Sequence, residues 1–505
     1  MIFETELPPS WGTARLDEVC GINERSFSPL PAARDMPVHF VPMAAVQEEF
    51  GGIDLADRRP LGEVIKGYTA FVEGDVLLAK ITPCMENGKL ALVPKLADHV
   101  GFGSTEFHVL RSGDALLAAW IARYVSQMAF RRAARQDMSG SAGQLRVQTP
   151  WLAAVTVPIA PLAEQQRILQ RVDEALSEID AGVLELEAAK RKLALYRQSL
   201  LKSALEGAMT ARWRTTGAER KSGAALLQQV SHRRQRIWRA SRSSKYVPPL
   251  GFERRALFEL PRGWAWASID EVTQSSSYGT STKCDAGATG TPVLRIPNLR
   301  SGHISLSDLK YSAAPLGMDD AEFLRPGDVL VVRTNGSVSI VGNAACVPRP
   351  GLGGNFYFAS YLLRLRPVLP RLMGAWIAAW LRSPTARQLI ETMAASSAGQ
   401  HNIGLSALLR LPIPIAPVAE MRTALGFFKE QSSACEAHES AIALALKMAA
   451  AQRQNILRAA FSGQLMPQDP SDEPASVLLE RIRAERQASP QASKRKPGRA
   501  AKVAA

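Results

Sequence analysis

Two polar loops carry the side chains with the clearest capacity for chemistry. Each follows an apolar segment that begins Gly-Asp-Val-Leu, at residues 74–77 and 327–330, and the loops read Lys80-Ile-Thr-Pro and Arg333-Thr-Asn-Gly. Lys and Arg supply positive charge and N–H donors, whereas Thr and Asn side chains both donate and accept hydrogen bonds. The loops are therefore candidates for a surface that recognises a polar partner.

The sequence lacks the motifs of several common enzyme classes. It contains no Gly-x-x-x-x-Gly-Lys-[Ser/Thr] phosphate loop, no Gly-x-Ser-x-Gly elbow, no His-Glu-x-x-His zinc helix and no Asn/Asp-Pro-Pro-Tyr/Phe run for amino methylation. The five cysteines are isolated and the seven histidines are scattered, so no zinc framework is indicated. We expect a chain that is not itself an enzyme and binds no metal or cofactor.

The formal net charge of +14 is unevenly distributed along the 505 residues. Residues 212–245 hold ten Lys or Arg against one acidic residue, and residues 491–505 hold five against none. These two segments account for the whole net charge, so charge alone does not predict that the remaining regions bind nucleic acid. The end of the chain, Lys494-Arg-Lys-Pro-Gly-Arg499, is typical of a disordered basic tail.

No apolar run approaches the roughly 20 residues that a membrane helix needs. The first residues, Met-Ile-Phe-Glu-Thr-Glu, lack the basic and then apolar order of a signal peptide. We therefore expect a soluble, cytoplasmic protein without a membrane partner.

The chain repeats itself at a nearly constant offset. Residues 7–19 and 260–272 share the pattern Leu-Pro-x-x-Trp and end in Asp-Glu-Val, 253 positions apart. Further on, Ser141-Ala-Gly-Gln144 recurs as Ser397-Ala-Gly-Gln400, at an offset of 256. Such a match over most of the chain predicts two copies of one structural unit. Trp11 and Trp264 are interpreted as packing residues at the entry to a strand.

Each copy continues into a long segment without proline, at 162–206 and 418–462, rich in helix-forming residues. In both, apolar residues recur every seven positions, a pattern typical of a buried helix or of a coiled coil. Two helices with equal apolar seams, the stripes formed by these residues, bury them most simply by packing on each other. The predicted seam consists of Leu186, Leu193 and Leu200 in the first helix and Ile442, Ala449 and Ile456 in the second.

These features together resemble the DNA-specificity subunit of type I restriction-modification systems. The resemblance rests on the order and repetition of the duplicated segments and covers roughly residues 7–465. The segments that carry it are the two Gly-Asp-Val-Leu strands, Ser104-Thr-Glu-Phe107, Arg333-Thr-Asn-Gly-Ser337 and the helix entries Pro158-Ile-Ala-Pro161 and Pro414-Ile-Ala-Pro417.

The resemblance implies an α+β fold in which two pseudo-repeated mixed α/β target-recognition domains are joined by two long antiparallel helices that form a coiled coil. On this basis we divide the chain into target-recognition domains at 1–161 and 250–413, long helices at 162–207 and 414–463, a basic linker with an amphipathic helix at 208–249, and an amphipathic helix with a basic disordered tail at 464–505.

The family's function implies what this chain binds. Each recognition domain would read one half of a bipartite site in double-stranded DNA. The helices would set the length of the spacer, the unread DNA between the two halves, and would dock two methylation subunits. Restriction and translocase subunits would join through the complex. S-adenosylmethionine, ATP and Mg are expected on those partner subunits and not on this chain.

The side chains expected to contact DNA come from the polar loops and from the repeated Ser-Ala-Gly-Gln segments. In the major groove, Arg pairs bidentately with guanine, and Asn or Gln with adenine. The candidates are Lys80, Thr82, Lys89, Gln144 and Arg146 in the first copy and Arg333, Thr334, Asn335, Gln400, His401 and Asn402 in the second. A further group, Arg123, Arg131, Arg132 and Arg135, is either a phosphate-binding patch or a solvated helix face.

Two other functions remain open from the residues alone. The chain could be a coiled-coil scaffold without DNA contact, because its globular regions have a neutral average charge. It could also be a DNA methyltransferase or nuclease in its own right, although the missing motifs argue against this.

Overall fold

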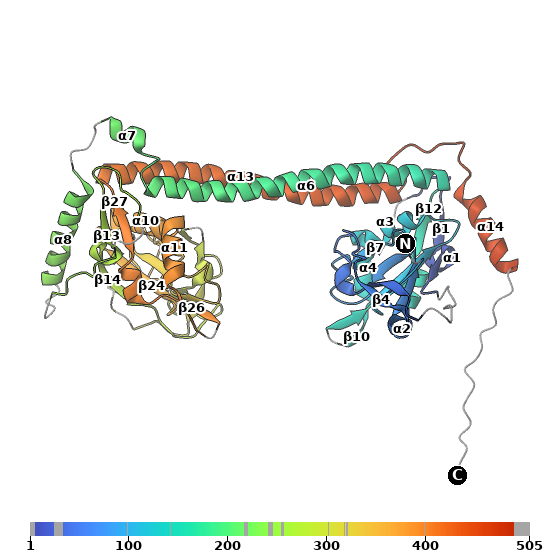
Figure 1. The fold of residues 1–505 in the computed structure, drawn as a ribbon, viewed down its shortest axis with the longest axis horizontal. Coiled ribbons are helices and arrows are strands. Elements are labelled where there is room, and N and C mark those ends of the chain that lie inside the picture. Colours follow the sequence, from blue (N-terminus) through green and yellow to red (C-terminus); the bar gives the residue numbers. More distant parts are fainter. Residues whose placement is uncertain are drawn as a thin grey trace, which may run out of the picture. The chain divides into compact units, whose positions relative to one another are not determined.

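The structure is a computed structural model of the whole chain and forms two compact units (Figure 1). One unit contains Met1–Leu186 with Leu444–Ala505, and the other contains Glu187–Ala443. The predicted basic tail, residues 491–505, lies outside the described residues. Those are residues 6–24, 34–97, 99–141, 143–216, 221–240, 246–253, 257–300, 302–317, 319, 322–397 and 399–488.

The globular part of the first unit is built on two four-stranded sheets. One is antiparallel, in the order β2(Cys20–Ile22), β9(Phe107–Ser112), β6(Val76–Ala79), β7(Leu90–Leu92). The other, in the order β4(Arg58–Pro60), β3(Pro37–Val41), β8(Val100–Gly103), β5(Thr69–Val72), contains one parallel pair, β3 with β8. Two short pairs complete the strands: β1(Gly12–Arg15) with β12(Thr156–Ile159), and β10(Ser139–Ser141) with β11(Gln144–Arg146).

The second unit repeats this plan. Its antiparallel sheet has the order β14(Thr273–Tyr278), β24(Leu362–Pro367), β20(Val329–Val332), β22(Ala344–Cys346), and its mixed sheet the order β15(Cys284–Asp285), β19(Lys310–Ser312), β16(Pro292–Leu294), β23(Tyr357–Phe358). The remaining strands are β13(Ala265–Ser268) with β27(Pro412–Ile415), β17(Leu299–Arg300) with β18(His303–Ile304), and a small sheet of β21(Thr334–Asn335), β26(Gln400–Asn402) and β25(Ala395–Ser397).

Short helices cover these sheets in both units. In the first they are α1(Leu16–Val19), α2(Leu61–Val64), α3(Ala118–Ser126), α4(Met128–Asp137) and α5(Thr149–Ala154), with a 3-10 turn at Met43–Ala45. In the second they are α9(Ile269–Val272), α10(Pro370–Leu381), α11(Pro384–Met393) and α12(Leu405–Leu409), with a 3-10 turn at Ile296–Asn298. The largest fully buried side chains of the main cores are Trp120 in the first unit and Trp376 and Trp380 in the second.

The strand that follows each repeated tryptophan is paired identically in the two copies. Gly12 of β1 lies opposite Ile159 of β12, and Ala265 of β13 lies opposite Ile415 of β27. These positions are related by the offsets of 253 and 256 that the sequence shows. Trp11 and Trp264 are buried and each stands directly before its strand, as the sequence analysis predicted.

Two long helices, α6(Leu162–Leu205) and α13(Val418–Phe461), each have 44 residues. In the first unit the early part of α6 packs near the end of α13, where Asp180 forms an ion pair with Arg453. In the second unit the end of α6 packs near the start of α13, and Arg197 pairs with Glu436 at 3.0 Å. Within each unit the two helices therefore run antiparallel. Gly207 and Gly463 follow them with φ of +82° and +69°, the left-handed conformation that ends a helix.

The six predicted seam residues face inward to different degrees. Leu200 and Ile456 are buried, each with 8% of its surface exposed. The other four, Leu186, Leu193, Ile442 and Ala449, are half-buried.

A shorter helix follows each long helix and packs on the globular part of the same unit. α8(Gly223–Ala240) buries Leu226 and Val230, and Gly223 is so close to the carbonyl oxygen of Ile415 that no Cβ would fit. α14(Ala475–Ala488) buries Ala475 and Leu479, and Gly12 of β1 lies beneath it. A five-residue helix, α7(Ala211–Thr215), precedes α8.

Each repeated tryptophan is joined to the first turn of a long helix by a buried hydrogen bond. The Nε1 of Trp11 donates to Glu164 of α6 at 3.0 Å, and the Nε1 of Trp264 donates to Glu420 of α13 at 2.9 Å. The two carboxylates differ in their other partners. Glu420 also accepts from Thr210 at 2.6 Å and forms an ion pair with Arg214. Glu164 instead accepts a long hydrogen bond of 3.4 Å from the uncharged side chain of Gln468, and burial raises its pKa.

This difference predicts unequal effects of the same substitution. Glu420→Gln removes the charge that Arg214 needs and is expected to destabilise its unit by about 1–3 kcal/mol. Glu164→Gln is expected to stay within about 1 kcal/mol of the wild type. Because the folded pKa of Glu164 lies above the unfolded value near 4.5, its contribution to stability is present below that pH and is lost as the pH rises through the folded pKa.

Hydrogen exchange of the β1/β12 and β13/β27 amides in the full-length variants would report the two units separately. Equal loss of protection in Glu164→Gln and Glu420→Gln at neutral pH would contradict the prediction.

Candidate nucleic-acid interface

In the first unit, the loop after β6 is held against the β10–β11 hairpin. The backbone oxygen of Lys80 accepts from the N–H of Val147 at 2.8 Å, and the N–H of Thr82 donates to Leu145 at 3.0 Å. Residues from both predicted segments are thereby brought together. Lys80 and Thr82 lie beside Arg146, with the exposed Gln144 at the hairpin end.

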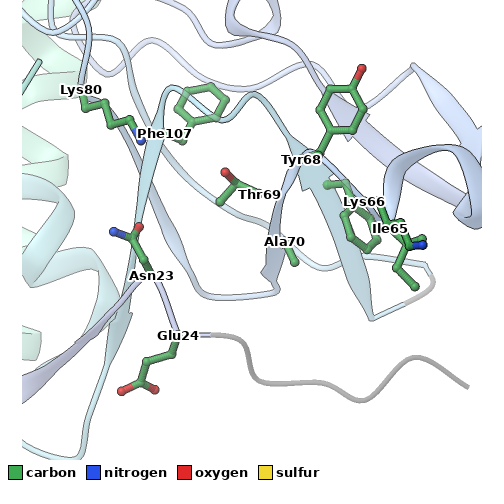
Figure 2. Close-up of a pocket in the computed structure, with 11 residues that line it drawn as sticks. Asn23, Glu24, Ile65, Lys66, Tyr68, Thr69, Ala70, Lys80 and Phe107 are labelled. Carbon is green, nitrogen blue, oxygen red and sulfur yellow. The ribbon is translucent and has the colours of Figure 1, made fainter. Parts of the chain in front are cut away.

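The Lys80 side chain lines a hollow of about 680 Å³ between the two sheets. Tyr68 and Lys66 line its other side, and Figure 2 shows the Lys80 ammonium group directed toward Phe107. Burial lowers the pKa of Lys80, and the nearby carboxylate of Glu106 partly offsets this effect. A partly desolvated cation in an open hollow attracts an anionic ligand.

Arg146 is held by a carboxylate that sequence reasoning missed. Its Nε and Nη2 donate to the two oxygens of Glu106, both at 2.8 Å, and its Nη1 donates to the backbone of Gln144 at 3.2 Å. These hydrogen bonds raise the pKa of Arg146 and lower that of Glu106. The Nε and Nη2 donors of Arg146 are therefore occupied by Glu106, and this contact supports the hairpin.

Two other predicted residues of the first unit also have protein partners. Thr82 donates through Oγ1 to Glu86 at 3.2 Å, and Lys89 donates through Nζ to the backbone oxygen of Met43 at 3.1 Å. Lys89 lies across the turn from the hairpin, just before β7, so the structure does not group it with Gln144 and Arg146.

In the second unit, Arg333 occupies the position that corresponds to Lys80. It follows the buried strand β20, and its backbone oxygen accepts from Ile403 at 3.0 Å, as that of Lys80 accepts from Val147. The predicted residues on either side form one small sheet, in which Thr334 lies opposite Asn402 and Asn335 opposite His401. All six predicted residues, Arg333, Thr334, Asn335, Gln400, His401 and Asn402, thus converge although they come from two distant segments.

The side chains of this cluster differ in whether their polar atoms have hydrogen-bond partners within the protein. Thr334 donates to the side-chain oxygen of Gln400 at 3.2 Å, and the Oδ1 of Asn335 accepts from the N–H of Ser337 at 2.9 Å. The Oδ1 of Asn402 is buried and has no hydrogen-bond partner among the described residues. The guanidinium of Arg333 lies over the ring of Tyr278, 4.9 Å from its centroid. Tyr278 was not predicted, and no repeat or motif marked it.

The arginine group on α3 and α4 is largely engaged within the protein. Arg131 is buried and forms two 2.8 Å hydrogen bonds with Glu49. Arg135 pairs with Glu86 at 3.0 Å, and Arg123 with Asp173 at 2.6 Å. Arg132 is exposed. Three of the four arginines therefore have a structural role, whatever else they contact.

The part of the chain that the structure describes contains no group of three or more His, Cys, Asp or Glu side chains placed to hold a metal ion. Within the same residues, no helix is both long enough and apolar enough to cross a bilayer.

The fold defines a class of protein: two copies of an α+β domain, each with a convergent polar surface, joined by two long helices. No family model matches the chain. It is 25% identical over 487 residues to the type I restriction enzyme EcoEI specificity subunit of Escherichia coli, covering 85% of this chain and 79% of the relative. It is also 24% identical over 389 residues to the EcoKI specificity subunit of Escherichia coli (strain K12), covering 75% and 74%.

Solved structures share the fold. A chain from a study of complex assembly and conformational transition of the type I R-M system superposes with a TM-score of 0.64 at 20% identity, covering 91% of this chain and 100% of that one. The HsdS subunit of Thermoanaerobacter tengcongensis superposes with a TM-score of 0.50 at 19% identity, covering 92% and 99%. Over most of its length the chain is therefore similar to the specificity subunits of type I restriction enzymes.

Proposed function

We propose that this chain is the non-catalytic subunit that gives a type I restriction-modification complex its DNA sequence specificity. One observation carries the proposal. In each unit, side chains suited to reading base edges converge at the same two places, the end of the central strand and the neighbouring hairpin. The frame is the same in both, but the residues differ, with Lys80 in the first and Arg333 in the second. Two such surfaces suit a target with two unlike halves.

The domain limits proposed for this function are those predicted from the sequence. Residues 1–161 and 250–413 would each read one half of the site. The helical segments 162–207 and 414–463 would set the spacer, and the segments 208–249 and 464–505 would secure each long helix to a recognition domain.

The partners proposed are double-stranded DNA, two methylation subunits and, through them, restriction subunits in the cytoplasm. The long helices expose apolar side chains that suit protein docking. In the first unit these are Leu184, Leu444 and Met448, with 70%, 59% and 63% of their surface exposed, and in the second Leu195, Tyr196 and Phe427, with 66%, 50% and 43%. S-adenosylmethionine, ATP and Mg would be bound by the partners.

The test is DNA binding by the chain purified together with its methylation partners. Selection from a randomised duplex library should recover a split site with two defined halves and an unread spacer. Affinity should fall steeply with salt, because phosphate contacts release counterions. Recovery of one continuous short site would contradict the proposal, and no DNA binding would favour a scaffold.

Helix length should determine the spacer. Seven residues inserted in each long helix, after Ala188 and after Leu444, keep the heptad register and add about 10 Å of helix. The spacer is then expected to lengthen by roughly three base pairs, while both half-sites stay the same. The measurement is the same library selection.

The control insertion is seven residues beside Val247, an exposed position outside the helices. It should leave the spacer unchanged. Altered half-sites with an unchanged spacer in the helix variant would show that helix length does not set the spacer length.

A further inference from the structure

Arg333 is the cation of the second interface whose charged group has no carboxylate partner. No hydrogen bond joins its guanidinium to the described residues, and its Nε is buried without a partner. In the same sheet Arg366 is bound bidentately by Asp328, and Arg364 donates to the backbone of Glu322. The terminal N–H groups of Arg333 are thus available to a ligand.

Tyr278 restricts where that guanidinium can lie. It ends β14, has 45% of its surface exposed, and its ring lies beneath the Arg333 guanidinium at 4.9 Å. Cations are attracted to the face of an aromatic ring, and the planar guanidinium stacks on it without losing its in-plane donors. The ring therefore holds the cation and leaves its hydrogen-bonding edge free.

A second unsatisfied atom lies on β26, the strand that pairs with the segment after Arg333. The Oδ1 of Asn402 is buried without a partner, and the next residue, Ile403, donates its N–H to the backbone oxygen of Arg333. A buried polar atom without a partner indicates that a ligand or an ordered water completes it.

We propose that Tyr278 positions Arg333 to read a guanine in the half-site of the second domain. The proposal rests on the proposed function. Guanine offers two acceptors, O6 and N7, to the paired donors of an arginine, whereas adenine places a donor at the first of these positions. The corresponding residue of the first domain, Lys80, carries an ammonium with three rotatable donors and lacks the rigid, planar pair of donors of an arginine.

The first experiment replaces the guanines of the selected second half-site, one at a time, with 7-deazaguanine, which lacks the N7 acceptor. At one position the affinity of the wild-type complex should fall about tenfold. Arg333→Ala should lose this sensitivity, because the contact is already absent. A second half-site without guanine, or with no sensitive position, would overturn the inference while leaving the proposed function intact.

The second experiment tests Tyr278 as a positioning residue. Tyr278→Ala should reduce discrimination between guanine and the other bases at that position by several-fold, and Tyr278→Phe, which keeps the ring face, should retain it. In the Arg333→Ala background, Tyr278→Ala should have no further effect on discrimination. Unchanged discrimination in Tyr278→Ala, or equal loss in Tyr278→Phe, would overturn the role.

Binding to the first half-site is the internal measure of folding and assembly. It should be unaffected in each of these variants. If the wild-type complex selects no split site at all, the proposed function fails, an outcome distinct from failure of the guanine contact.

Discussion

The double substitution Arg333→Ala with Asn335→Ala is expected to abolish recognition of the second half-site and to leave recognition of the first unchanged. Both residues lie on the surface that converges at the end of β20, and Asn335 pairs with His401 across β21 and β26. A well-made bidentate base contact provides about 1–3 kcal/mol of discrimination. Loss of two such contacts should lower specific affinity roughly 30-fold or more, since each 1.4 kcal/mol is a factor of ten.

The measurement is binding of the assembled complex to duplexes in which one half-site at a time is scrambled. For the double variant, scrambling the second half-site should no longer matter. The reciprocal variant, Lys80→Ala with Thr82→Ala, should lose recognition of the first half-site only. Loss of both halves in either variant would show that the two surfaces do not act separately.

The largest effect on stability is expected from Asp328→Asn. Asp328 and Arg366 are buried, with side chains 1% and 7% exposed, and the carboxylate accepts from Nε at 2.8 Å and from Nη2 at 2.7 Å. The neighbouring Arg364 is also buried, and burial together with the charge of Arg366 lowers its pKa. Replacing the carboxylate by an amide breaks this buried ion pair on one side, which costs about 3–5 kcal/mol.

Because a chain of two units need not unfold in one step, the variant is best followed by hydrogen exchange of the β14, β20 and β24 amides. Glu391→Gln, which removes a half-exposed i,i+4 pair with Arg387, is the control and should cost less than about 1 kcal/mol. Protection of the central sheet in Asp328→Asn equal to that in Glu391→Gln would contradict the prediction.

The proline-free segments at 162–206 and 418–462 predicted the bounds of the long helices to within one residue, because local signals mark both ends, whereas the domain division at 414 began the second helix four residues too early. Pro161 and Pro417 precede them, a glycine closes each, and no proline interrupts them. The repeated Trp and Gly-Asp-Val-Leu segments located the strands for the same reason, since strand entries and buried strands have local patterns. Asp75 and Asp328 within those segments form equivalent ion pairs with Arg111 and Arg366.

The details of the interface could not be predicted, because they depend on contacts between distant segments. Arg146 and Glu106 are 40 positions apart, and nothing in the local sequence of either indicates the pair. Tyr278 ends a serine-rich strand, and only closure of the sheet brings it beneath Arg333. Which side chains are free to contact DNA is decided by such partners, so residue type alone cannot identify them.

The hydrogen bonds from Trp11 to Glu164 and from Trp264 to Glu420 attach each domain to its long helix, a role distinct from the base recognition proposed for the polar loops. Each fastens a domain to its helix through residues that are not part of the polar loops at Lys80 and Arg333. Mutations in a loop can therefore alter which bases are chosen without disturbing the joint. Under the proposed function, one recognition domain could be exchanged for another at this joint while the long helices stay the same.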